Sequence, residues 1–305
     1  MTQKKFPVRD YDLAATLTSG QTFRWQQTGD AWDGVIHGRW LRLRQLTSPP
    51  LSSSSSLSHI EATITLPDDD WRWLTNYLRL DDDHAAALAS FPDDAPMRAA
   101  TAHCRGLRLL RQEPWECLAS FILSSTKQIV QIQQCVALLC ERYGDLLREP
   151  PGEGTGPTCC RPGPPTRRAS FSFPPALRLA AATEAELRAC KIGFRAAYLR
   201  DAARRVSSGM LDLAALPGLP LEEARAALME CHGVGRKIAD CVLLFSLGFD
   251  TAFPIDVWVE RALQQLYFPK RRVKRARLER FAATHFGPHA GLAQQYLFHY
   301  LRTRQ

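Results

Sequence analysis

The 305-residue chain lacks several features that would place it in a specialised class. No run of its sequence approaches the roughly 20 apolar residues of a membrane-spanning helix, which excludes a helical membrane protein. The start, Met1 to Pro7, has no apolar stretch of the kind found in signal peptides, so we expect no secretory signal. The absence of an internal repeat excludes repeat architectures such as solenoids.

Cysteine occurs without an arrangement that indicates a disulfide framework or a metal site. The 9 cysteines are scattered along the chain, and without a secretory signal we expect free thiols. Cys159 and Cys160 are adjacent within a proline- and glycine-rich stretch, which is not the spacing of metal ligands.

Positive charge exceeds negative charge. Lys and Arg number 39 against 31 Asp and Glu, a net charge of +8, which indicates a polyanionic partner. The hydrophobic content of 45% fits a soluble globular protein, and the length permits two or three domains. The densest basic run is residues 270–280, which is either a solvated helix face or an edge that contacts phosphates.

The N-terminal third alternates apolar and polar residues, a pattern that predicts β-strands. We expect strands over 22–26, 31–37, 40–45 and 61–66. The serine-rich segment 47–58 is predicted to be a flexible hairpin tip.

From Asp68 the hydrophobic period becomes helical. Residues 113–143, 183–208 and 221–266 are predicted to be mostly helical. Residues 149–168 are dense in proline and glycine, so we expect a disordered insertion there.

The most informative stretch is residues 230–248, which contains a Gly-Val-Gly turn followed by Lys237 at the start of an apolar helix. An amine there is partly desolvated and near a positive helix end, and both effects favour its use as a nucleophile. Asp256 lies 19 residues further on. The helix takes the chain roughly 17 Å away from Lys237. The extended run 249–255 spans about 23 Å and can bring the chain back toward it. The amine and the carboxylate can therefore meet.

Each of these residues also has an ordinary structural interpretation. A Gly-X-Gly turn is often only a tight corner between helices. Asp256, directly before a helical segment, fits a helix N-cap, and a lysine in a first helical turn is usually solvated. The spacing alone leaves both interpretations open.

Residues 233–237 and Asp256 resemble the helix-hairpin-helix and Gly/Pro-Asp motif of base-excision DNA glycosylases. Four further blocks narrow the resemblance to the 8-oxoguanine DNA glycosylase/AP-lyase family, and these are residues 19–25, 109–125, 192–198 and 286–298. The blocks are spread over nearly the whole chain. No four-cysteine cluster follows the hairpin, which argues against the iron–sulfur branch of this superfamily.

The resemblance implies an α+β fold. An N-terminal antiparallel β-sheet subdomain, similar to the TATA-binding protein, would pack on a helical helix-hairpin-helix domain, with DNA across the cleft between them. We place the first domain at residues 1–112 and the second at 113–305.

An enzyme that cuts an N-glycosidic bond must first extrude the nucleotide from the duplex. Lys237 suits attack on the sugar C1′, because an amine leaves a Schiff base that permits β-elimination of the 3′ phosphate, which a water nucleophile could not do. Asp256 suits stabilisation of the developing positive charge on the sugar. The lysine therefore predicts lyase activity in addition to base removal.

For the base pocket, the resemblance implies five residues. The backbone carbonyl of Gly20 would accept the N7 hydrogen that 8-oxoguanine has and guanine lacks. Phe298 and Cys241 would sandwich the flipped base, Gln294 would contact its Watson–Crick edge, and Phe245 would line the pocket. Without the resemblance, Phe298 would be interpreted as a core aromatic and Cys241 as a small buried hydrophobe.

Further residues are assigned to DNA and ion contacts. Backbone amides of Gly233, Gly235 and Lys237 can bind a phosphate. The resemblance also implies a monovalent cation held by main-chain carbonyls of Met229, Cys231 and Val234.

The chain departs from the eukaryotic pattern of the family at several DNA-contacting positions. Thr126 replaces an asparagine wedge, and Gln131 replaces an arginine that contacts the opposite cytosine. Phe194 replaces a tyrosine wedge, Arg195 matches the pattern, and Trp258 replaces a histidine. The chain resembles the bacterial branch, and strict preference for cytosine opposite the lesion is not expected.

We predict a bifunctional DNA glycosylase/AP-lyase that excises 8-oxoguanine from duplex DNA, acting as a monomer without a cofactor and without a membrane partner. The expected location is the bacterial cytoplasm at the nucleoid, or the nucleus if the source is eukaryotic. Two alternatives remain: another glycosylase of the superfamily, acting on alkylated or mismatched bases, and a non-catalytic, structure-specific DNA-binding protein.

Overall fold

The structure, a computed structural model, describes residues 1–47, 57–65, 70–125, 127–147 and 170–304. Most of the predicted serine-rich tip, nearly all of the predicted proline- and glycine-rich insertion, and Thr126 lie outside the described residues. None of the helices within the described ranges is long and apolar enough to cross a membrane.

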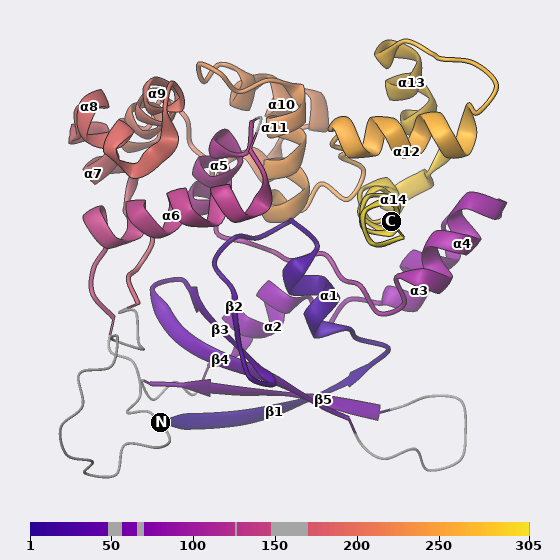
Figure 1. Ribbon diagram of the computed structural model, residues 1–305, viewed down its shortest axis with the longest axis horizontal. Coiled ribbons are helices and arrows are strands. Elements are labelled where there is room, and N and C mark those ends of the chain that lie inside the picture. The colour runs from indigo at the N-terminus through magenta and orange to yellow at the C-terminus, as the bar shows by residue number, and fades with distance from the viewer. Residues whose placement is uncertain (48–56, 66–69, 126, 148–169, 305) are drawn as a thin grey trace.

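A five-stranded antiparallel sheet forms the lower layer of the molecule (Figure 1). Its order is β1-β5-β4-β3-β2. The strands are β1 (Thr2–Arg9), β2 (Gln26–Thr28), β3 (Ala31–Ile36), β4 (Arg39–Thr47) and β5 (Leu57–Ile64).

Two strand predictions need correction, and one strand was not predicted. The strand expected over 22–26 is wrong, because Phe23 and Trp25 are buried in the core and only Gln26 pairs with a neighbour. The strand expected over 61–66 is β5, which begins at Leu57 because its first residues pair with both β1 and β4. The edge strand β1 was not predicted, since only Phe6 and Val8 mark its buried face.

One face of the sheet is covered by short helices. Leu41, Leu43 and Ile60 are completely or almost completely buried there. They share a core with residues of α1 (Leu13–Thr18) and α2 (Arg72–Leu78), which lie between the sheet and the main helical layer (Figure 1).

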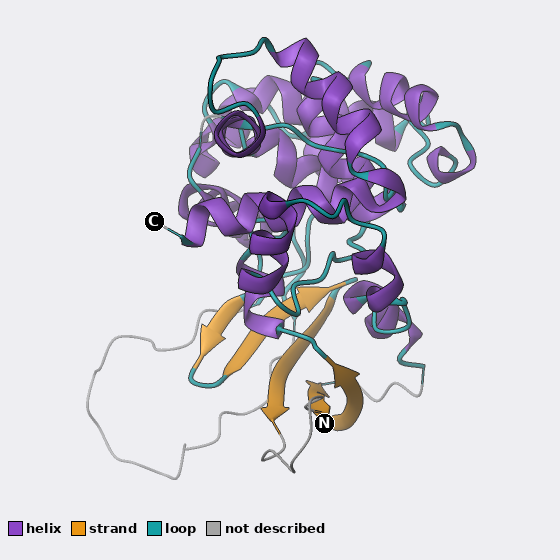
Figure 2. Cartoon of the chain, turned by 90° about the vertical axis from the view of Figure 1, so that its right-hand side faces the viewer, coloured by secondary structure: helices purple, strands orange, loops and turns teal. Residues whose placement is uncertain are grey.

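The remaining helices form the upper layer, as the side view in Figure 2 shows. They are α3 (His84–Ala89), α4 (Ala95–His103), α5 (Pro114–Leu123), α6 (Ile129–Tyr143), α7 (Ala176–Ala181), α8 (Glu184–Leu187), α9 (Arg195–Ser207), α10 (Leu221–Met229), α11 (Arg236–Val242), α12 (Val257–Tyr267), α13 (Arg275–His285) and α14 (Ala290–Thr303). π-Helical turns follow α8 at Arg188–Ile192 and α11 at Leu243–Leu247, and 3₁₀ turns lie at Leu216–Gly218 and Gly287–His289.

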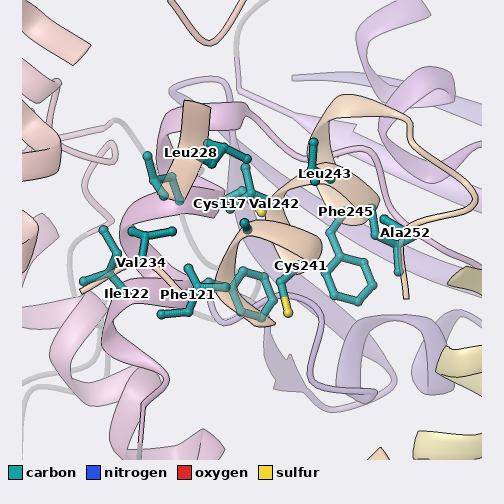
Figure 3. Packing of buried hydrophobic residues seen from close by; sticks show 14 of the residues in the cluster. Cys117, Phe121, Ile122, Leu228, Val234, Cys241, Val242, Leu243, Phe245 and Ala252 are labelled. Carbon is teal, nitrogen blue, oxygen red and sulfur yellow. The ribbon is translucent and has the colours of Figure 1, made fainter. Parts of the chain in front are cut away.

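The larger hydrophobic core surrounds α11. Cys241, Val242 and Phe245 project from this segment into apolar surroundings (Figure 3).

The larger hydrophobic core also includes residues that precede position 112. The hydroxyl of Tyr296 on α14 donates to the carbonyl of Leu107 at 3.1 Å, which ties the last helix to the chain that leaves α4. The division into domains at residue 112 stays a prediction.

Candidate active site

Lys237 is the second residue of α11, as the sequence predicted, and it follows the N-cap Gly235. Its side chain is half-buried. The Nζ atom donates a hydrogen bond to Oγ of Ser124 at 3.0 Å and lies 5.2 Å from the centre of the Phe121 ring. The Ser124 hydroxyl itself donates to the carbonyl of Phe121 at 2.7 Å, so its lone pairs are free to hold the amine. The end of α5 therefore fixes where the amine stands.

Ser124 and Phe121 were not assigned to the site from the sequence. They belong to a block that carried the family resemblance, yet neither side chain has a chemical property that would single it out. Only the packing of α5 against α11 reveals their contact with the amine.

Cys241 lies one helical turn after Lys237 and is buried. Burial raises the pKa of its thiol to about 12, the positive charge of Lys237 opposes that rise, and the negative charge of Asp256 adds to it. Lys237 and Asp256 are thus both within electrostatic reach of one sulfur atom. Figure 3 shows the Cys241 sulfur on the same side of α11 as the rings of Phe121 and Phe245. These two rings stack at 5.5 Å.

Asp256 is the N-cap of α12. Its Oδ1 accepts a hydrogen bond from the backbone N–H of Val259 at 2.8 Å. The structural interpretation of this residue is therefore confirmed. A carboxylate fixed in this way has little freedom to turn, and it keeps a second oxygen for charge stabilisation at the site.

The turn between α10 and α11 requires glycine at its first position. Gly233 has a φ of 81°, and a Cβ there would stand 2.3 Å from the Tyr198 ring. At Gly235 the space for a side chain is open, which leaves the backbone of the turn accessible to a phosphate.

The three carbonyls expected to hold a cation come from the same connection. Met229 is the last residue of α10, and the carbonyl of Cys231 accepts a hydrogen bond from the N–H of Val234 at 3.0 Å. The cation site stays a prediction. Within the described residues, no group of three or more His, Cys, Asp and Glu side chains could hold a metal ion.

Gly20 and Phe298 lie side by side, although 278 positions separate them in the sequence. Gly20 has a φ of 82°, and a Cβ there would stand 3.3 Å from Cε1 of Phe298 and 3.0 Å from Cδ1 of Ile129. A side chain at position 20 would therefore enter the space beside the Phe298 ring, which explains the need for glycine in physical terms.

Two buried glutamines from other parts of the chain hold this segment. Gln295 donates to the carbonyl of Ser19 at 2.9 Å, and Gln112 donates to the carbonyl of Gln21 at 2.7 Å. The N–H of Gln112 in turn donates to the carbonyl of Phe245 at 2.8 Å. The carbonyls of Ser19 and Gln21, on either side of Gly20, each accept a hydrogen bond. The Gly20 carbonyl itself accepts none from the described residues. That acceptor is available to a ligand.

Gln294 is buried, and within the described part of the chain its Oε1 has no hydrogen-bond partner. A buried amide oxygen without a donor is costly, by about 1–3 kcal/mol. It persists most readily where a ligand supplies the missing donor.

Because of this cost, we expect that replacing Gln294 raises the stability of the protein and lowers its activity. Gln294→Met should raise the free energy of unfolding by about 1 kcal/mol, because a thioether of similar length needs no hydrogen bond, and it should slow base excision. Gln295→Met is the matched control: it should destabilise by about 1–3 kcal/mol, since it leaves the Ser19 carbonyl unpaired. Urea unfolding and single-turnover excision of each variant measure both effects. A Gln294→Met protein that is less stable than wild type would contradict the assignment of Oε1 as unpaired.

The side chains predicted to contact DNA have different environments. Phe194, at the N-terminus of α9, is 56% exposed and packs edge-to-face on Tyr198 at 5.7 Å. Arg195 is buried and donates to the carbonyl of Ser125. Gln131 is exposed, and its Oε1 accepts from the N–H of Gln128 at 3.0 Å in a capping box at the start of α6.

Trp258 lies in the first turn of α12, two residues after Asp256, and is half-buried. The guanidinium of Arg261 stands 5.0 Å from its ring. The Phe194 ring is thus exposed, whereas the Arg195 guanidinium donates to the protein backbone.

A buried ion pair inside the hairpin was not foreseen from the sequence. Oδ1 of Asp240 on α11 accepts from Nε of Arg225 on α10 at 2.6 Å, and both side chains are buried. Burial raises the pKa of the Asp240 carboxyl to about 6, although Arg225 opposes the rise. The pair fixes α10 against the helix that carries Lys237.

Arg225→Met should destabilise the protein by about 3–5 kcal/mol at pH 7.5, because it removes the hydrogen-bonded, buried partner of the Asp240 carboxylate. A carboxyl whose pKa is raised on folding favours the folded state below its ordinary pKa of 3.8 and loses this contribution as the pH rises through about 6. Removing the Arg225 guanidinium raises the pKa of Asp240 further, so more of this carboxyl is neutral at pH 5. The loss of stability should therefore be smaller at pH 5 than at pH 7.5. Arg236→Met is the control, since Arg236 stands 3.8 Å from Asp240 and is partly exposed. Urea unfolding at both pH values tests this, and an equal loss at pH 5 and 7.5 would exclude the explanation.

The sequence and fold match known proteins over nearly the whole chain. Residues 5–118 match the N-terminal domain of 8-oxoguanine DNA glycosylase, and residues 119–286 match the HhH-GPD superfamily of base excision DNA repair proteins. The chain is 34% identical over 277 residues to the N-glycosylase/DNA lyase of Saccharomyces cerevisiae, which covers 84% of this chain and 68% of that protein.

Two solved structures have the same architecture. The structure of MBOgg1 in complex with a low affinity DNA ligand has a TM-score of 0.84 and 30% identity, and the match covers 100% of this chain and 99% of that chain. The 8-oxoguanine glycosylase/lyase of Clostridium acetobutylicum, in complex with double-stranded DNA containing cytosine opposite to 8-oxoG, has a TM-score of 0.81 and 27% identity, covering 99% and 97%.

The antiparallel sheet, the helical layer and the lysine-bearing hairpin define a base excision DNA repair protein of the helix-hairpin-helix superfamily. Within that superfamily, the chain belongs to the 8-oxoguanine DNA glycosylase family. The predicted family, the α+β fold and the enzyme class, a DNA N-glycosylase and DNA lyase, are confirmed. The alternative of a non-catalytic DNA-binding protein is thereby excluded. The placement in a bacterial branch stays a prediction.

Proposed function

We propose that this protein excises 8-oxoguanine from duplex DNA and cleaves the strand at the resulting site, with Lys237 as the nucleophile and Asp256 as the charge-stabilising group. The observation that carries the proposal is the environment of the Lys237 amine. Ser124 holds it at 3.0 Å at the start of α11, and the charge of Asp256 acts on the neighbouring Cys241 thiol.

The chemistry follows from these two groups. With the lesion nucleotide extruded, the unprotonated amine attacks C1′, the C1′–N9 bond breaks, and the base leaves with a proton. The fixed carboxylate of Asp256 stabilises the positive charge that develops on the sugar. After ring opening, the Schiff base acidifies the C2′ proton, and its removal expels the 3′ phosphate. Water then releases the lysine.

The proposed base pocket has two groups, the Gly20 carbonyl and the Gln294 amide oxygen, without a hydrogen-bond partner among the described residues. The Gly20 carbonyl would accept from N7 of 8-oxoguanine, and the Gln294 amide would pair with its Watson–Crick edge. The Phe298 ring and Cys241 would cover the two faces of the base. Phe245 is held against Phe121, and it would close the pocket on the side of α11.

We propose duplex DNA as the partner, with the following contacts. The Gly233–Gly235 turn and the exposed Phe194 ring would contact the lesion strand and the vacated stack. Between residues 270 and 280, Lys270, Arg271, Arg272, Lys274, Arg277 and Arg280 are exposed, which supports an edge that contacts phosphates. We propose that the protein acts as a monomer, at the nucleoid of a bacterial cytoplasm or in a eukaryotic nucleus.

The test is incubation with an 8-oxoguanine:C duplex labelled on the lesion strand. Strand analysis with and without alkali separates base removal from strand cleavage. We expect product in both, and borohydride should trap a covalent complex. Activity on alkylated bases or on mismatched adenine, without activity on 8-oxoguanine, would refute the proposal in favour of another specificity of the superfamily.

Discrimination of the opposite base should be weak. An arginine can offer two donors to a cytosine edge, and such a contact is worth roughly 1–3 kcal/mol. Gln131 offers one amide on a shorter side chain, and it must leave its capping box to reach the DNA. We therefore expect the preference for C over A opposite the lesion to stay below about a hundredfold in single-turnover excision, or ~2.7 kcal/mol.

Gln131→Arg should increase this preference. Gln134→Arg adds the same charge to an exposed position of the same helix, and it should strengthen binding to all duplexes without changing their order. A wild-type preference above a hundredfold would show that other residues restore the discrimination.

A further inference from the structure

Arg302 lies in the last turn of α14, four residues after Phe298, and its guanidinium stands 5.1 Å from the centre of the Phe298 ring. Its Nη1 is also 3.4 Å from the point that a Cβ on Gly20 would occupy. The guanidinium therefore lies over the Phe298 ring and beside Gly20, the two residues proposed to contact the face and the N7 edge of the flipped base.

The interactions of this guanidinium with the described residues are few. Among the described residues it makes no hydrogen bond and no ion pair, although the side chain is half-buried. Burial lowers the pKa of Arg302, and the nearby negative charge of Asp256 opposes that shift. Arg304, two residues on, differs: its Nη1 donates to the hydroxyl of Tyr300 at 2.9 Å. A half-buried cation with unused donors favours a ligand that brings an acceptor.

The neighbouring Gly20 carbonyl indicates which acceptor this is. If Gly20 accepts from N7–H of 8-oxoguanine, the C8 carbonyl oxygen is on the adjacent ring atom, at the same edge of the base. Guanine has a C–H at C8, so it offers nothing to a donor there. The guanidinium lies beside Gly20, the residue whose carbonyl would hold this edge of the base.

We propose that Arg302 is a specificity-determining residue that donates a hydrogen bond to the C8 carbonyl oxygen of the flipped base. The inference rests on the proposed function, because it assumes the pocket described above. Undamaged guanine would then leave two groups unpaired, the Gly20 carbonyl and the Arg302 guanidinium. Losing a hydrogen bond to a charged group reduces affinity by about 10- to 100-fold.

The first test measures binding in the Lys237→Gln background, which prevents turnover. We expect Arg302→Met to reduce the preference for an 8-oxoguanine:C duplex over a G:C duplex by at least about tenfold, with little change in affinity for G:C. Arg302→Lys, which keeps one donor and the charge, should retain part of the preference. If both duplexes lose affinity equally, Arg302 contacts a phosphate and the proposal fails.

The second test separates the base from the rest of the nucleotide. Arg302→Met should slow excision of 8-oxoguanine, whereas cleavage at a preformed abasic site should stay within about twofold, because no base is present there. Arg304→Met, which changes a nearby arginine bonded to Tyr300, should leave both rates unchanged. Equal loss in both reactions would show that Arg302 acts through Asp256 or the backbone instead, and no loss in either would exclude a contact.

The two proposals fail in different ways. If wild-type protein does not excise 8-oxoguanine, the proposed function is wrong. If wild type does excise it and Arg302→Met keeps the full preference for the lesion, only the role of Arg302 is wrong. Thermal unfolding of Arg302→Met and Arg302→Lys confirms that each variant is folded before the comparison.

Discussion

Lys237→Gln should abolish excision and strand cleavage, with a loss of more than about 10⁴-fold in single-turnover rate. The amide of glutamine can still donate to Oγ of Ser124 and pack on Phe121, so the fold and DNA binding should be retained. It has no nucleophilic lone pair at neutral pH, so no Schiff base can form. Borohydride trapping on the lesion strand is the direct measurement, with band-shift affinity as the measure of binding.

Lys5→Gln is a suitable control for this experiment. Lys5 is on strand β1 and pairs with Glu61 at 3.5 Å, in the sheet and not in the hairpin. Its loss should leave trapping at the wild-type level. Trapping of the Lys237→Gln protein as efficiently as wild type would show that another amine is the nucleophile.

Asp256→Asn should slow base excision by about 10²–10³-fold, the scale observed when a preorganised electrostatic group is removed from an active site. Asparagine is as good an N-cap as aspartate, so the hydrogen bond to the N–H of Val259 should survive and stability should change little. The negative charge that stabilises the sugar is lost. Excision rates measured beside urea unfolding separate the two effects.

Asp83→Asn provides the matched control, because Asp83 caps α3 through the same type of bond, to the N–H of Ala86 at 2.9 Å. That variant should keep full activity. Asp256 would be only a cap if its substitution unfolds the protein while the folded fraction remains fully active. Strand cleavage at a preformed abasic site is expected to fall less than base excision, since no glycosidic bond is broken there.

The sequence determined the elements whose signal is local. The Gly-Val-Gly turn followed by an apolar run predicts a helix that begins beside Lys237, and the structure has α11 there. Asp256 before an amphipathic segment predicts an N-cap, and the bond to Val259 is present. These features depend on backbone conformation within a few residues, so composition and spacing are enough to find them.

The tertiary structure decided everything that depends on contacts between distant segments. Strand β1 has a weak pattern of its own, and its pairing with β5 makes it a strand. The expected strand over 22–26 failed for the converse reason, because burial of Phe23 and Trp25 in the core replaces sheet pairing.

The same distinction applies to the site. The sequence supplied the lysine and the aspartate, whose chemistry is visible in the residue type. It did not show that Ser124 holds the amine, that Arg225 neutralises Asp240 inside the hairpin, or that Arg302 stands beside Gly20. Serine and arginine are frequent and chemically versatile, so their identity alone predicts no partner. Only the packing of α5, α10 and α14 around the site determines which groups these side chains contact.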